Sequence, residues 1–231
     1  MQSLDRSIER DASGWGDWIK LHRSVWRRIA VARTRPERAG EAWPLALTGG
    51  SPPSGEGDQL YHHILALGRT SFGVELAFER LMQACEDFNS LVGFGGDDAV
   101  AEAGFRMSNE LHAFFVCADA FWDNLRALAR AMPGLAELAR ARSEHAPAAD
   151  VARTARDHLE HLAERIETGR DEKFGPAMTA QTFRRVTGGF DGTTAYFGDE
   201  EFDVPAVREA VARAAEAART ALIGVLGVVD D

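Results

Sequence analysis

Apolar residues recur every three or four positions over most of the chain, the spacing that places them on one face of an α-helix. This pattern predicts helices over residues 59–88, 98–132, 135–143, 150–169 and 205–226. Gly68 and Gly73 are positions at which the first helix could kink or split. Apolar side chains cover most of the circumference of segment 98–132, so we expect it to be the most buried helix of a bundle.

The segment before the last helix follows a different pattern. Short β-prone runs lie between residues 186 and 204, and the first two flank Asp191-Gly192, a dipeptide typical of tight turns between antiparallel strands. We therefore predict a β-hairpin at about 183–204, followed by a helix that Pro205 opens. The expected fold class is all-α, a bundle of about five helices with a small β-hairpin inserted before the C-terminal helix.

The N-terminal part has an amphipathic helical pattern of its own. Apolar residues occupy one face of the predicted helix, and basic residues, mostly arginines, occupy the other faces. Its apolar members are Trp15, Trp18, Ile19, Trp26 and Ile29. Paired glycines and prolines in residues 47–58 then argue against regular structure. We expect a basic helical arm at 1–46, a linker at 47–58 and a helical domain at 59–231. Exposed tryptophans would promote aggregation, so the arm is expected to pack on the body or on a second subunit.

Charge and composition narrow the classes of function. The net charge is −10, yet residues 1–40 hold nine Lys and Arg against five Asp and Glu, which leaves an acidic body. Such a body disfavours broad nonspecific binding of nucleic acid. The sequence contains neither a recognisable export signal nor a membrane-spanning run of apolar residues, so we expect a cytoplasmic protein. Cys85 and Cys117, both inside apolar runs, are expected to be buried, reduced thiols.

The stretch from Ala155 to Arg165 contains the one pattern that points to chemistry. Arg156 is followed by a polar residue and, after four intervening positions, by His161. In this motif the chain resembles the HEPN superfamily, small helical bundles that carry an Arg, four to six residues and then a His. The resemblance implies a homodimeric domain, often an endoribonuclease that needs no metal or other cofactor, with RNA as the partner bound near the dimer interface.

Within that resemblance each residue of the motif has a role. Arg156 would hold the scissile phosphate, because a guanidinium group binds phosphate oxygens in a bidentate fork. His161 would transfer protons as a general base or acid. The neighbouring polar residues would line the binding site, namely Asp157, His158, Glu160 and Arg165.

Helical geometry leaves other interpretations open. Arg156 and His161 are roughly 140° apart around an ideal helix, so a shared site needs a long arginine reach, a distorted helix or a second subunit. His158, His161 and Arg165 lie on one edge instead. Alternatively, Arg156 pairs with Glu160 one turn away and His158 is a hydrogen-bonded core histidine. The protein would then be a noncatalytic helical interaction or dimerisation protein.

A metal site is the third possibility. His158 and His161 could ligate a metal if His112, Asp119 or Asp123 approached from the 98–132 helix. The sequence has no Glu-x-x-His pair repeated on two helices and no closely spaced cysteine pair. We therefore expect no metal ligands.

Overall fold

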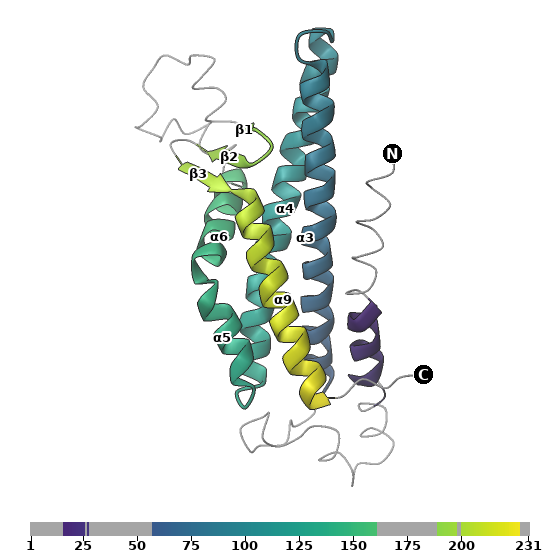
Figure 1. Cartoon of the computed structure of the whole chain (residues 1–231), viewed down its shortest axis with the longest axis vertical. Coiled ribbons are helices and arrows are strands. Elements are labelled where there is room, and N and C mark those ends of the chain that lie inside the picture. Colours follow the sequence, from purple (N-terminus) through teal and green to yellow (C-terminus); the bar gives the residue numbers. More distant parts are fainter. Residues whose placement is uncertain (1–15, 26, 28–56, 161–188, 198–199, 227–231) are drawn as a thin grey trace. The chain divides into compact units, whose positions relative to one another are not determined.

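The computed structural model describes residues 16–25, 27, 57–160, 189–197 and 200–226 (Figure 1). Residues 16–25 are helical. The labelled helices are α3 (Gly57–Leu91), α4 (Asp97–Ala131), α5 (Ala136–Glu144), α6 (Ala146–Glu160) and α9 (Val204–Leu226). The strands are β1 (Gly189–Phe190), β2 (Thr194–Phe197) and β3 (Glu200–Asp203). The predicted all-α bundle with a small antiparallel insertion before the last helix is confirmed. None of the described helices is both long and apolar enough to cross a membrane.

The chain divides into two compact units. Among the described residues, the first holds 16–25, 27, 57–72, 121–145 and 212–226, and the second holds 73–120, 146–160, 189–197 and 200–211. The helices α3, α4 and α9 each contribute a segment to both units.

In the first unit the N-terminal helix packs on α3 and α9. Trp18 is buried and lies against Gly68, where an added Cβ would come within 3.1 Å of the indole Cδ2. Asp17 forms an ion pair with Arg219 of α9. The ring of His22 lies 4.4 Å, between centroids, from that of Tyr61. The helix thus packs on its own chain, one of the two arrangements expected for the arm.

The buried face of this helix differs from the predicted one. Leu21 and Val25 are fully buried beside Trp18, whereas Ile19 is 38% exposed. Residues three and seven positions after Trp18 lie on the same face of the helix as Trp18. Ile19, the next residue, lies about 100° around the helix from it. Trp15, Trp26 and Ile29, which completed the expected stripe, lie outside the described residues.

The two glycines of α3 do not split it, because the helix is continuous from Gly57 to Leu91. At Gly73 an added Cβ would lie 3.1 Å from the Sγ atom of Cys117, so this glycine, like Gly68, lets a side chain from another helix approach closely. The cysteines are free thiols, as expected, although Cys85 is buried and Cys117 only partly so.

The core of the second unit lies between α4 and the small sheet. Phe115 of α4 is fully buried, and its ring centroid lies 6.0 Å from that of Phe197 and 6.3 Å from that of Phe202. Phe114, also fully buried, packs against Phe78 of α3. The prediction that α4 is heavily buried is confirmed for most of its apolar residues, although Val116 is 37% exposed.

The predicted hairpin is part of a three-stranded antiparallel sheet with the order β1-β2-β3. Gly192 has a positive φ of 106° in the first turn, a conformation that glycine adopts without strain. The carboxylate of Asp191 accepts hydrogen bonds from the backbone N–H groups of Thr193 and Thr194 and from the hydroxyl of Tyr196. These bonds, that of Tyr196 first, hold the pKa of Asp191 well below its ordinary value.

Replacing Asp191 by Asn is expected to flatten the acid limb of the stability profile. Because its pKa is depressed in the folded state, the ionised Asp191 stabilises the fold above the ordinary value of 3.8, and this contribution is lost as the pH falls below it. Denaturant unfolding at several values from about pH 5 to about pH 2 should show a smaller loss of stability in Asp191→Asn than in the parent. Parallel profiles for the two proteins would contradict the role of this carboxylate.

One helix boundary was predicted wrongly. The α6 helix begins at Ala146, before the predicted start at residue 150, and contains Pro147 in its first turn. A proline is tolerated there because the first backbone N–H groups of a helix have no intrahelical acceptor. The predicted end of this helix at Gly169 lies outside the described residues.

Candidate functional site

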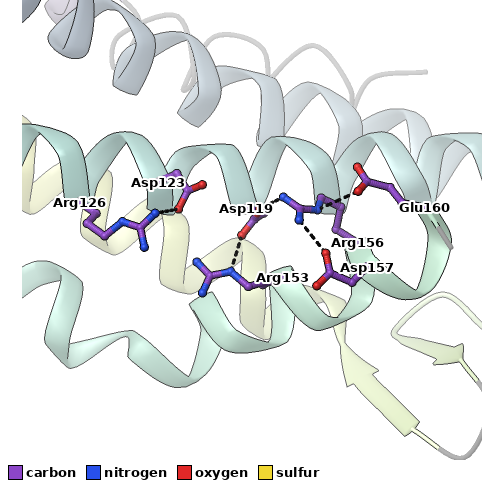
Figure 2. Close-up of polar contacts among 7 residues, drawn as sticks. All are labelled: Asp119, Asp123, Arg126, Arg153, Arg156, Asp157 and Glu160. Atoms are coloured by element: carbon purple, nitrogen blue, oxygen red, sulfur yellow. Dashed lines mark hydrogen bonds and ion pairs between the residues drawn. The ribbon is translucent and has the colours of Figure 1, made fainter.

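Arg156 lies on α6, and three carboxylates surround its guanidinium group (Figure 2). Its Nη1 pairs with Asp119 of α4, its Nη2 donates to Asp157 at 2.6 Å, and its Nε lies 3.4 Å from Glu160. The Arg156 side chain is 29% exposed, so part of the group still reaches solvent. The pair with Glu160, expected from the i, i+4 spacing, is present.

Asp119 is the buried centre of this cluster. It is 1% exposed and also lies 3.5 Å from the Nε atom of Arg153, one turn before Arg156 on the same helix. A buried carboxylate is costly unless cations or hydrogen-bond donors compensate it. Two arginines spaced i, i+3 on α6 supply that compensation, so Asp119 and its partners fasten α6 to α4 within the second unit (Figure 2).

The electrostatics of the cluster disfavour an anionic ligand. Three carboxylates and two guanidinium groups leave one net negative charge. The hydrogen bond to Asp157 raises the pKa of Arg156, and so does the charge of Asp119. Arg156 is therefore a permanent cation whose partners are already acidic groups, and a phosphate would have to displace at least one of them.

Asp157 and Glu160 were predicted to line a binding site. In the structure both contact the guanidinium group of Arg156. Their side chains are 45% and 44% exposed. On the solvent side of the cluster they cover the guanidinium group with negative charge. In the structure both residues form ion pairs with Arg156, and their role in binding stays a prediction.

His158 lies in a different environment. Its Nε2 atom is 3.0 Å from Oε2 of Glu200 on β3, and its ring is nearly parallel to that of Phe197, with an angle of 7°. Its side chain is 20% exposed. His158 therefore contacts the sheet and is hydrogen-bonded, as one interpretation predicted, although it is only partly buried and does not join the cluster around Arg156.

His161 and Arg165 lie outside the described residues. The convergence of Arg156 and His161 on one phosphate accordingly stays a prediction. Within the part of the chain that the structure describes, no group of three or more His, Cys, Asp or Glu residues is arranged to hold a metal ion.

Asp119 and Arg153 were not connected with Arg156 from the sequence. A signal was present, because Asp119 is a charged residue with apolar neighbours in sequence on the helix predicted to be most buried, where a charge needs a partner. The spacing of apolar residues in the sequence does not show which residue that partner is. Asp123, considered with Asp119 as a possible metal ligand, instead pairs with Arg126 on the same helix at 2.7 Å (Figure 2).

No family model matches the chain, and no curated protein or solved structure matches it significantly. The function must therefore be argued from the geometry of the site and from the surface of the protein.

Proposed function

We propose that this protein acts by binding a partner and performs no catalytic step, with the Arg156 cluster serving to hold α6 against α4. The observation that carries this proposal is the ion pair between Arg156 and the buried Asp119. Removing either partner would leave the other charge partly desolvated, as expected of a structural contact.

The same contacts weigh against cleavage of RNA. A phosphate-binding arginine needs donors directed at the oxygens of the ligand, whereas Asp119 and Asp157 take one Nη atom each and Glu160 lies beside Nε. The cost of separating these pairs would reduce the affinity for phosphate. The net negative charge of the body acts in the same direction, because it repels the RNA backbone.

The surface of the second unit supports a binding role. Phe94 and Phe105 are 97% and 73% exposed, and Val92 is 50% exposed. Large aromatic side chains on the surface are the residues that most often anchor protein interfaces. Exposed aromatic side chains lower the solubility of a protein. A partner that covers them on binding is therefore the best explanation for their presence on the surface.

A ribonuclease of the HEPN type is the second candidate, and one observation favours it. The side chains of Arg156, Asp157 and Glu160 remain 29%, 45% and 44% exposed, close to the end of the described part of α6. The cluster thus reaches solvent near the point at which His161 follows in the sequence. In this function a homodimer would bring two copies of the motif to a bound RNA, with no metal required.

Cleavage of a single-stranded RNA in the presence of a chelator separates the two candidates. The binding proposal predicts no cleavage by the parent and none by His161→Ala or Arg156→Ala. Arg153→Ala is the matched control, since it removes an arginine that also faces Asp119 but is not the arginine paired with His161 in the proposed site. Cleavage by the parent and by Arg153→Ala that disappears in both motif variants would overturn the binding proposal in favour of the ribonuclease.

A further inference from the structure

The turn between α3 and α4 presents an apolar surface, which we name the hairpin tip and define as residues 86–106. Phe94 is the most exposed large apolar side chain among the described residues, at 97%, and Val92 and Phe105 lie in the same segment at 50% and 73%. Apolar residues that occur singly on a surface are ordinary, whereas the hairpin tip carries three exposed ones within 14 residues of sequence.

Two backbone hydrogen bonds close the turn of the hairpin tip. The N–H groups of Phe94 and Gly95 both donate to the carbonyl of Leu91, at 3.1 and 2.8 Å. Gly93 adopts a positive φ of 95°, and a Cβ added to Gly95 would lie 3.1 Å from the same carbonyl oxygen. Glycine at these two positions permits the tight turn, which the two hydrogen bonds to Leu91 close with Phe94 exposed.

The hairpin tip is also strongly acidic. Its ionisable residues are Glu86, Asp87, Asp97, Asp98, Glu102 and Arg106. Arg106 is paired with Asp87 at 3.1 Å, which leaves an excess of carboxylates around the apolar side chains. Asp97 and Asp98, in the first turn of α4, are exposed next to the turn that carries Phe94.

This charge distinguishes between the possible partners. Anionic lipid and nucleic acid would both be repelled by the carboxylates, although either could accept an exposed phenylalanine. A second hairpin tip would carry the same negative charge, so direct pairing of two tips is disfavoured as well. A basic partner would gain from both the charge and the apolar contacts.

We infer that the hairpin tip binds a positively charged protein segment that bears aromatic or aliphatic side chains. This inference rests on the proposed binding function and names the class of its partner. Phe94 and Phe105 would be the anchors buried on binding, and the surrounding carboxylates would select basic sequences and accelerate association.

Selection from a library of random peptides tests the inference without requiring that the natural partner be identified. The parent protein is the target, and Phe94→Ser is used for counter-selection, so that retained peptides depend on the hairpin tip. The enriched peptides are expected to carry net positive charge together with Trp, Phe or Leu. Their affinity should fall at least about tenfold in Phe94→Ser and in Phe105→Ser, and should weaken in Asp97→Asn/Asp98→Asn and at higher salt.

Phe72→Ser is the matched control, because Phe72 is also exposed, at 42%, but lies outside the hairpin tip. It should bind the peptides as the parent does. Failure to enrich peptides, enrichment of neutral or acidic ones, or equal binding by Phe94→Ser would overturn the inference, as would Phe94-dependent flotation with vesicles that contain phosphatidylserine. These outcomes differ from failure of the proposed function, which would appear as RNA cleavage that depends on Arg156 and His161.

Discussion

Replacement of Phe115 by Ala should lower the free energy of unfolding by about 3–5 kcal/mol, the range for truncating a fully buried phenylalanine. Phe115 is 0% exposed and contacts the rings of Phe114, Phe197 and Phe202. The variant loses the transfer free energy of the ring and leaves a cavity between α4 and the small sheet. Denaturant unfolding followed by circular dichroism measures the change.

Phe105→Ala is the matched control for this prediction. Phe105 is on the same helix but 73% exposed, so its removal should change stability by no more than about 0.5 kcal/mol. A loss below about 1 kcal/mol in Phe115→Ala would mean that the sheet does not pack on α4 as described. Equal losses in the two variants would have the same meaning.

Replacement of Asp119 by Ala is expected to cost about 2–4 kcal/mol, somewhat less than the usual cost of breaking a fully buried ion pair. Asp119 is 1% exposed. Without its carboxylate, Arg153 and Arg156 lose the negative charge with which both pair. The partial exposure of both arginines, 44% and 29%, lets water screen part of the unpaired charge. Thermal and denaturant unfolding both report the loss.

Asp123→Ala provides the comparison. Its carboxylate is 46% exposed and pairs with Arg126 on the same helix, so the change should be less than about 1 kcal/mol. If the two aspartate variants were equally stable, the burial of Asp119 would have no energetic consequence. The Arg156 cluster would then not be what fastens α6 to α4.

The helices were predictable because the apolar residues that recur at helical spacing in the sequence are mostly the ones buried in the folded protein. The long helix α4 and the start of α9 next to Pro205 follow the pattern closely. Local sequence patterns were insufficient where contact with another element determines the role of a residue. Gly68 was interpreted as a possible break in α3 because the approach of Trp18 is not visible in the sequence around the glycine.

The candidate site shows the same limit. The pair of Arg156 with Glu160 follows from helical spacing, which the sequence displays. Asp119 is 37 residues from Arg156, and Glu200 is 42 residues from His158. Contacts at such separations depend on which helix faces cross, and a single sequence does not specify these crossings. The ion pairs of Arg156 with Asp119 and Asp157 were therefore not predicted, and the role of the motif with His161 stays a prediction.

The most direct test of a structural role for Arg156 is a double-mutant cycle with Asp119→Ala and Arg156→Ala. Unfolding free energies of the parent, both single variants and the double variant give the coupling between the two side chains. We predict a stabilising coupling of about 1–3 kcal/mol, with each single variant destabilised. A coupling near zero, in an Arg156→Ala protein that is as stable as the parent but has lost an RNA-cleaving activity, would contradict the account.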